Sequence, residues 1–213
     1  MNAFSERVHI MNEALHTRQA QKEATQARVL EVARAHFERH GFEGASIRAI
    51  ASDAEVAAGT VLLHFTDKLG LLHAALHDDL EETIRRCLAG VPVRGKILGR
   101  LAAIAKPFYG YYAARPTLSK VLLRESLLAE SPWRERFTGQ LTRVLTQVVV
   151  ITEEAKASGE LERSTDSRLF ATAFSSFYYF ALIGWVQGAL QDPLPLFEQL
   201  MGQHIKGCRS KKS

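Results

Sequence analysis

Apolar residues recur with the 3.6-residue period of an α-helix through almost the whole chain of 213 residues. In residues 26–40, for example, Val29, Leu30, Ala33 and Phe37 fall on one helical face. No stretch shows a convincing alternation of apolar and polar residues, which a half-buried strand would require. The period therefore predicts an all-α protein.

Glycine, proline and capping residues indicate where these helices begin and end. Gly41 is expected to close the first helix, and Ser46 is a good N-cap for a short second helix. Apart from that short helix, the expected helices cover about residues 26–40, 58–65, 69–89, 95–113, 116–130, 132–158, 166–191 and 193–205. The polar first 24 residues are expected to form a frayed helix or a flexible arm.

The formal net charge of +4 comes from the end of the chain. Lys206, Arg209, Lys211 and Lys212 supply four positive charges, and the rest of the chain holds 23 basic against 23 acidic residues. Residues 1–68 hold 8 Lys or Arg against 9 Asp or Glu. Net charge therefore does not predict nucleic-acid binding, and any DNA-binding face must come from the local arrangement of a few residues.

Cys87 and Cys208 lie far apart, without the spacing of a disulfide framework or a zinc site, so we expect no metal and no cofactor. Charged residues run through residues 1–21, which argues against a secretory signal and favours a cytoplasmic location. Residues 169–191 are uncharged and long enough to span a membrane. Polar Thr, Ser and Gln residues interrupt them, and a buried helix has the same composition. We therefore expect no membrane.

The segment from Arg28 to Leu72 reads RVLEVARAHFERHGFEGASIRAIASDAEVAAGTVLLHFTDKLGLL and carries an ordered set of motifs. The motifs are an apolar helix ending in Phe37 and Gly41-Phe42, then Ser46-Ile47-Arg48-x-Ile50-Ala51, Gly59-Thr60, and His64-Phe65-x-x-Lys68 followed by Leu71-Leu72. The segment resembles the N-terminal domain of tetracycline-repressor (TetR) family regulators across its whole length.

The resemblance implies an N-terminal three-helix helix-turn-helix domain and a larger C-terminal helical bundle with dimerisation helices. The expected divisions are an N-terminal arm (1–24), a DNA-binding domain (25–70), a ligand-binding and dimerisation domain (71–206) and a basic tail (207–213). The implied function is that of a transcriptional repressor, which a small apolar or aromatic ligand releases from its operator. As a two-fold homodimer, it would read a near-palindromic double-stranded operator.

Two short helices joined by a tight turn can present the second helix to the major groove, and small residues let its backbone approach DNA closely. The candidate DNA-binding residues are Ser46, Arg48, Ala57, Ala58, Gly59, Thr60, Leu62, Leu63, His64 and Lys68. Structural alternatives stay open for three of them. Lys68 could be a solvated helix start, Arg48 a surface ion-pair residue, and His64 a packing residue.

The segment departs from the TetR pattern close to the expected DNA face. Glu55 stands in the turn where Gly is frequent, Ala57 and Ala58 stand where Ser and a basic residue are common, and Leu62 replaces the usual Tyr. Ala57 cannot cap the expected recognition helix, residues 58–65, which costs about 1 kcal/mol. These changes predict modest affinity, unless the arm, through residues such as Arg18, supplies further contacts.

Aromatic residues in the larger domain could line a ligand cavity, because such sites are mostly apolar with a few polar groups. The candidates are Phe108, Tyr111, Tyr112, Trp133, Phe137, Phe177 and Tyr178. Aromatic stripes at helical spacing are also typical of an ordinary core, so either reading is open for each residue.

Residues 166–191 carry two apolar faces, so the helix needs two partners. In the family, the last two long helices form a four-helix dimer interface, with the small glycines allowing close approach. The candidate interface residues are Phe170, Phe174, Ala181, Gly184, Trp185 and Gly188.

Parts of the sequence are compatible with two other functions. An enzyme could use Glu125, Glu130, His73 and His77 as an acid/base or metal cluster, but no catalytic motif accompanies them. The second alternative is a helical dimer that no longer reads DNA and acts through protein partners. Glu55 and the other departures from the TetR pattern would favour it. Salt-sensitive DNA binding separates this alternative from a regulator.

Overall fold

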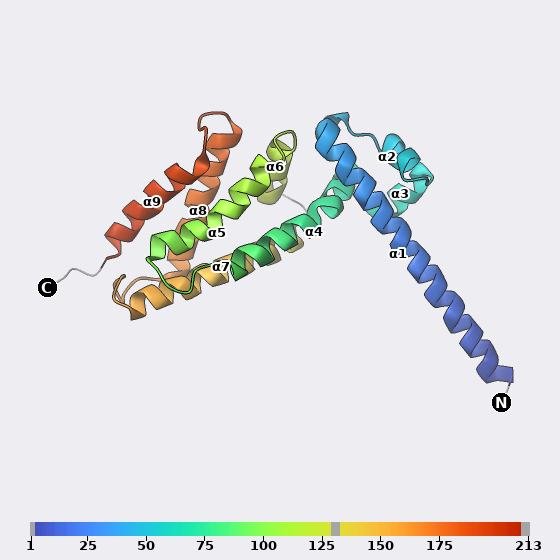
Figure 1. Ribbon diagram of the computed structural model, residues 1–213, viewed down its shortest axis with the longest axis horizontal. Coiled ribbons are helices and arrows are strands. Elements are labelled where there is room, and N and C mark those ends of the chain that lie inside the picture. Colours follow the sequence, from blue (N-terminus) through green and yellow to red (C-terminus); the bar gives the residue numbers. More distant parts are fainter. Residues whose placement is uncertain (1–2, 129–132, 210–213) are drawn as a thin grey trace. The chain divides into compact units, whose positions relative to one another are not determined.

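The computed structural model of the protein describes residues 3–128 and 133–209. Within these residues it has nine helices and no strand, which confirms the all-α class (Figure 1). The helices are α1 (Ala3–Gly44), α2 (Ile47–Asp53), α3 (Ala58–Phe65), α4 (Lys68–Ala89), α5 (Ile97–Ala113), α6 (Ser119–Leu128), α7 (Trp133–Ala157), α8 (Ser167–Val186) and α9 (Pro193–Gly207).

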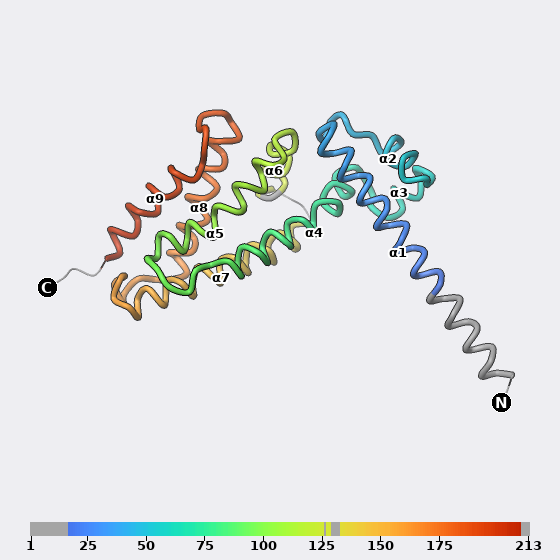
Figure 2. Tube along the Cα trace, in the orientation of Figure 1, coloured from blue at the N-terminus to red at the C-terminus, as the bar shows by residue number. Residues whose placement is uncertain are grey.

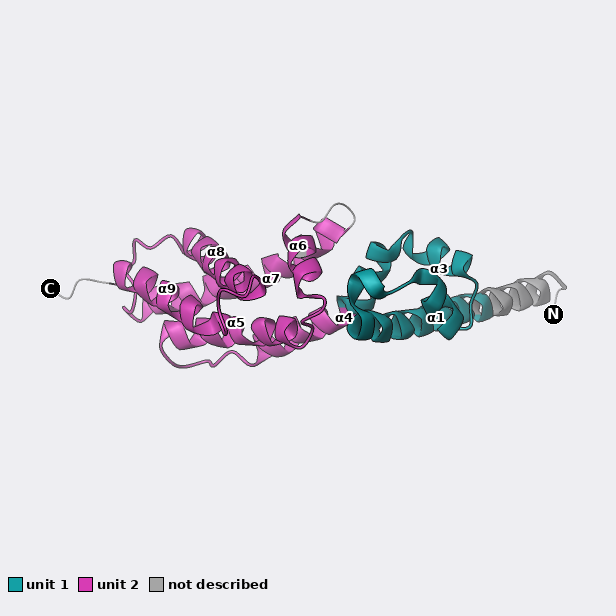
Figure 3. Ribbon diagram, turned by 90° about the horizontal axis from the view of Figure 1, so that it is seen from above, with its two compact units in different colours: residues 1–77 teal, residues 78–213 magenta. Residues whose placement is uncertain are grey.

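The chain forms two compact units, residues 1–77 and residues 78–213 (Figure 3). The boundary falls inside α4, so this helix begins in the first unit and continues into the second. A boundary inside a helix leaves no Pro- or Gly-rich linker for sequence analysis to find, and the division expected at residue 70 falls earlier along the same helix.

Helix α1 begins at Ala3 rather than near residue 26, so part of the expected arm is helical. Residues 17–25 contain neither Gly nor Pro, and most of them have good helix propensity. Gln19 also donates a side-chain hydrogen bond of 2.6 Å to Glu23 one turn later. The regular helix is interrupted at Gly41, whose φ of 68° and ψ of −179° are readily adopted only by glycine.

The first unit has a core made from α1, α2, α3 and the start of α4. Its fully or almost fully buried side chains are Val29, Ala33, Phe37, Ile50, Ala51, Val61, Leu71, Leu72 and Ala75. Two polar contacts brace the long first helix. The Arg34 Nε donates to the Ala75 carbonyl at 3.0 Å, and His36 meets Asp53 at 2.8 Å. These contacts tie α1 to α4 and to α2.

The second unit packs α5, α7, α8 and α9 around a shared core, and Figure 2 traces the tight reversal of the chain between α8 and α9. Arg100, almost fully buried, joins α5 to Glu154 of α7 at 2.5 Å. Tyr109 of α5 donates to the Tyr178 carbonyl of α8 at 3.2 Å. Pro107 lies inside α5, which continues beyond it to Ala113.

Two helix boundaries differ from the expected ones. Helix α6 starts at Ser119, because the residues after Pro116 first form a turn, in which Leu118 N donates to Arg115 O at 3.0 Å. Helix α8 ends at Val186 rather than near residue 191, because Gly188 adopts a φ of 81° and reverses the chain. Glu130 and Pro132, which were expected to lie at the next helix junction, fall outside the described residues.

Candidate nucleic-acid interface and ligand cavity

Helices α2 and α3, which a turn connects, differ at their N-termini: a side chain caps α2, and none caps α3. Ser46 caps α2 as expected, since its Oγ accepts a hydrogen bond from the Ala49 amide at 3.2 Å. Ala57 occupies the same position in α3 and makes no side-chain cap. The first amides of α3 therefore depend on solvent or on an external acceptor such as a phosphate.

Helix α3 presents small and apolar groups to solvent. Leu63 is 84% exposed and Leu62 is 44% exposed, whereas Phe65 is buried in the core. A Cβ on Gly59 would meet no atom within 4 Å, so this part of the helix is open to close approach by a partner. Exposed leucines suit contact with thymine methyl groups in a major groove.

The remaining candidates lie around this helix at different depths. Arg48 of α2 is exposed, and Ala58, Thr60 and His64 of α3 are half-buried. The His64 ring also packs against Phe65, with ring centroids 6.0 Å apart. Packing and a DNA contact are therefore compatible for His64, because its ring is still partly exposed.

Lys68 has an internal role that the sequence did not indicate. Its Nζ donates to the carbonyls of Ala45 at 3.2 Å and Glu43 at 3.4 Å, and it lies 4.5 Å from the centre of the Phe42 ring. Two of the three ammonium donors are thus directed at backbone. These contacts link the start of α4 to the α1–α2 connection and leave one donor, so a phosphate contact by Lys68 stays a prediction.

Two non-glycine residues near the recognition helix have positive φ. Glu55, in the turn between α2 and α3, has a φ of 55°, which L side chains other than Asn and Asp rarely adopt. Thr66, after α3, has φ 64° and ψ −54°, and Asp67 N donates to Phe65 O at 2.6 Å across it. This is a strained γ-turn with a β-branched residue at its centre.

The γ-turn explains a glycine that the sequence analysis did not single out. A Cβ on Gly70 would lie 2.4 Å from the Phe65 carbonyl oxygen. Asp67 caps the start of α4 by accepting a hydrogen bond from the Gly70 amide at 2.7 Å. The spacing of Asp67 and Gly70 is a capping signal that could have been found, whereas the close carbonyl is visible only in three dimensions.

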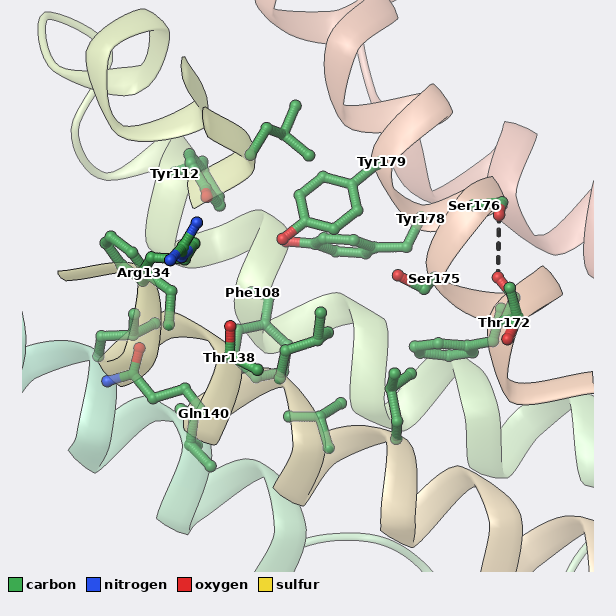
Figure 4. Close-up of a pocket in the computed structure, with 18 residues that line it drawn as sticks. Phe108, Tyr112, Arg134, Thr138, Gln140, Thr172, Ser175, Ser176, Tyr178 and Tyr179 are labelled. Atoms are coloured by element: carbon green, nitrogen blue, oxygen red, sulfur yellow. Dashed lines mark hydrogen bonds between the residues drawn. The ribbon is translucent and has the colours of Figure 1, made fainter. Parts of the chain in front are cut away.

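The second unit contains a cavity of about 600 Å³ (Figure 4). Residues from α4, α5, α6, α7 and α8 line it. Four of the expected aromatic residues are among them, namely Phe108, Tyr112, Phe137 and Tyr178. The volume lies in the range of small-molecule sites.

Three expected ligand residues lie elsewhere. Tyr111 is buried beneath the Arg115 guanidinium, which lies 4.3 Å from its ring centre. Phe177 packs on His204 of α9, and Trp133 does not line the cavity either. Tyr111 and Phe177 are sequence neighbours of Tyr112 and Tyr178, and one residue along a helix turns a side chain by about 100°.

Polar residues that the sequence analysis missed also line the cavity. These are Arg134, Thr138, Gln140, Thr172, Ser175, Ser176 and Tyr179. Arg134 is the one ionised side chain among the described lining residues, and no Asp or Glu is among them. Single polar residues on amphipathic helices gave no signal that would distinguish them from an ordinary solvated face.

Tyrosine residues gather at this site. The rings of Tyr109 and Tyr178 stack with centroids 4.9 Å apart, and Tyr178 meets Tyr179 edge-on at 5.2 Å. Burial, reinforced by the neighbouring tyrosines, raises the pKa of Tyr178 well above its ordinary value. The phenol therefore keeps its proton and can donate a hydrogen bond.

The expected dimer face of α8 turns out to pack inside its own subunit. Phe170, Phe174 and Ala181 are at most 3% exposed. Phe174 meets Phe197 of α9 edge-on, with centroids 5.3 Å apart. These three residues are therefore core residues, and their assignment to a partner-facing surface is wrong because α9 already covers them.

Contacts and geometry within the chain also explain why the two positions assigned to that face are glycines. A Cβ on Gly184 would lie 2.9 Å from Leu190 Cδ1, so this glycine makes room for the chain's own loop. Gly188 lies beyond the end of α8. Trp185 is half-buried, and the exposed apolar residues of α8 are Leu169 at 67% and Phe180 at 62%.

Comparison with known proteins agrees with this architecture. Residues 29–75 match the family of bacterial regulatory proteins described as the tetR family. The regulator UidR of Escherichia coli K12 is 34% identical over 68 residues, which are 32% of this chain and 35% of UidR. The chain thus spans about a third of the curated relatives that it matches.

Solved structures resemble the fold over most of the chain. FadR from Bacillus subtilis, in complex with stearoyl-CoA, has a TM-score of 0.67 at 20% identity, covering 86% of this chain and 99% of FadR. A protein from Saccharomonospora viridis, in complex with choline, has a TM-score of 0.65 at 20% identity, covering 86% and 96%. The first unit thus carries a segment that matches the tetR family, and the whole chain shares the all-α fold of these solved structures.

Proposed function

We propose that the protein is a ligand-responsive transcriptional regulator that binds DNA through α2 and α3 and a small molecule in the cavity of the second unit. One observation carries this proposal. Helix α3 lies inside the segment that matches the TetR family, has no side-chain N-cap, and exposes Leu62 and Leu63 to solvent. Repression relieved by the ligand is the mode that the family resemblance favours. The protein then works in the cytoplasm and is not an enzyme.

Helix α4 is the element that couples the two activities. It starts in the first unit at Lys68, and its residues Leu80 and Ile84 line the cavity in the second unit. A ligand can change DNA affinity only by favouring one of two conformations. A shift of α4 on ligand binding would change the presentation of α3.

Dimerisation would use the solvent-exposed side of α8. Leu169 and Phe180 are large, apolar and exposed, and their spacing of eleven residues, about three helical turns, places them on one face. An exposed apolar face of this kind suits a two-fold contact with the same helix of a second subunit. The resulting homodimer would read a near-palindromic operator.

Fluorescence anisotropy with DNA from the region upstream of the protein's own gene, at two salt concentrations, tests the proposal. An Arg48→Ala/Thr60→Ala double variant is the binding-deficient form, because both side chains are solvent-accessible. Saturable, selective binding that weakens with salt and in this variant is expected. A matched Arg39→Ala variant, which changes a residue of α1, should bind as the wild type does.

The second candidate is a helical dimer that binds protein partners in place of DNA. The exposed carboxylate of Glu55 in the turn favours it, since this charge would repel phosphate. No selective binding to the upstream fragments would move the search to a randomised DNA pool. Failure on that pool as well would overturn the DNA-binding proposal and leave this candidate.

A further inference from the structure

We infer that the cavity of the second unit takes an apolar carboxylic acid, with the carboxylate at Arg134 and the apolar body against the inner walls. This inference rests on the proposed function only in treating the second unit as the ligand-binding part. It adds the charge and the polarity pattern of the ligand, which neither the fold nor the family specifies.

Arg134 supplies the first argument. It is the second residue of α7 and makes no ion pair with any described residue, unlike Arg143 of the same helix, which binds Glu81 at 2.7 Å. Figure 4 shows its guanidinium on the same side of the cavity as Tyr112. A guanidinium pairs with a carboxylate through two parallel hydrogen bonds, so this end of the cavity is suited to an anion.

The hydroxyl groups supply the second argument. Tyr178 and Tyr179 direct their phenol ends toward the side of the cavity where Arg134 lies (Figure 4). Thr138 of α7 adds a further hydroxyl group to the lining. Phenol protons near a guanidinium can donate to the same carboxylate, and charge-assisted hydrogen bonds are roughly twice as strong as neutral ones.

Most of the remaining lining is apolar, and Gln140, Thr172, Ser175 and Ser176 add polar groups to it. Leu80 and Ile84 of α4, Phe108 of α5, and Val144 and Leu145 of α7 present hydrocarbon to the cavity. Hydrocarbon of a ligand that they bury is removed from water, which favours binding. The cavity thus combines one cationic side chain with a largely apolar lining, which suits an amphipathic acid.

The aromatic lining alone would also suit a quaternary ammonium ion, which binds over the faces of aromatic rings. Two observations argue against a cation here. The described lining residues include no Asp or Glu to balance a positive ligand, and they include Arg134, which would repel one. The choice between anion and cation therefore depends on one residue that can be changed.

Three ligands of equal chain length test this choice: decanoate, decanol and decyltrimethylammonium. Calorimetric titration of the purified full chain, without DNA, should give at least about tenfold tighter binding of decanoate than of the other two. Arg134→Gln should bring decanoate down to the affinity of decanol. Arg136→Gln is the matched control, because Arg136 stacks on Trp133 at 4.5 Å and does not line the cavity.

The opposite results overturn the inference. Equal binding of decanol and decanoate, tighter binding of the ammonium ligand, no binding of decanoate, or an Arg134→Gln variant that keeps the decanoate preference would each do so. Unfolding temperatures of both variants equal to that of the wild type would show that folding is not the cause. Because no DNA is present, a failed regulator and a failed ligand assignment remain distinguishable.

Discussion

The two units place their candidate sites in opposite ways. In the first unit, the candidate residues lie on the outside of short helices, within the stretch from Ser46 to Thr60 and just beyond it. In the second unit, the cavity lies among five helices, with lining residues from Leu80 to Tyr179. A surface built from neighbours in sequence follows from local rules, whereas a cavity built from distant segments depends on packing.

Strain is also distributed differently between the units. The first unit holds both non-glycine residues with positive φ, Glu55 and Thr66, beside its recognition helix. In the described part of the second unit, positive φ occurs only at glycines. Substitutions that relieve or add backbone strain should therefore act on the first unit, and substitutions that change packing should act on the second.

The largest expected effect on the free energy of unfolding comes from a packing substitution in the second unit. Phe174→Ala should lower the free energy of unfolding by about 3–5 kcal/mol, because it removes a buried ring between α8 and α9. Phe180→Ala, on the exposed side of the same helix, should weaken dimerisation in sedimentation velocity instead. If the two variants exchanged these effects, the corrected orientation of α8 would be wrong.

Two glycine substitutions in the first unit test the next largest expected effect on the free energy of unfolding. Gly70→Ala should lower the free energy of unfolding by about 1–3 kcal/mol, since the new Cβ would clash with the Phe65 carbonyl. Gly59→Ala has open space around it and should leave stability unchanged or slightly higher, while it weakens DNA binding. Chemical denaturation and anisotropy measure the two quantities, and equal stability of the two variants would argue against the tight γ-turn.

A gain of function tests whether the exposed α3 is a DNA-binding surface. Leu62→Tyr should tighten DNA binding about tenfold, because an added hydroxyl can donate to a phosphate, and hydrogen bonds to charged groups contribute about 1.5–3 kcal/mol. Anisotropy at fixed salt measures this change. Ligand binding in the second unit should stay the same. Unchanged DNA affinity would show that residue 62 does not lie near the phosphates.

Relief of strain in the turn should have a smaller effect. Glu55→Asn should raise the free energy of unfolding by about 1 kcal/mol, since Asn tolerates the left-handed conformation. Glu55→Gln is the control, because it removes the same charge without easing the backbone. Both variants should bind DNA more tightly, but only the Asn variant should be more stable in thermal unfolding.

The smallest effect concerns acid. Burial lowers the pKa of His204 of α9 from its ordinary value of 6.5, so the unfolded chain takes up a proton at a pH where the folded chain does not. The free energy of unfolding should therefore fall as the pH drops from about 6.5 toward the lowered pKa. His204→Gln should remove this part of the pH dependence in denaturation curves, and an unchanged slope would contradict it.

Carboxylates should respond in a different pH range. Backbone amides of Leu169 and Arg168 lower the pKa of Asp166, the N-cap of α8. Its contribution is present above its ordinary pKa of 3.8 and is lost only below that value. The two ranges are separate, so the His204 component can be measured without this one.

The sequence by itself determined the helical class, the motif of the first unit and most helix boundaries. Period, caps and glycine breaks act between residues that are close along the chain, so Ser46 and Gly41 could be assigned from their neighbours alone. The same local rules predicted which stretches of the second unit are helical. They did not predict where Gly188 would end α8.

Only the tertiary structure decided which face of each helix meets which neighbour. Two apolar faces on α8 look alike in sequence, and the packing of α9 against Phe174 buries one of them while Phe180 stays exposed. Likewise, Arg134 resembles any surface arginine in the sequence, and only the packing of five helices places it beside a cavity. The physical reason is that burial depends on contacts between distant segments, whereas the helical period fixes only which residues share a face.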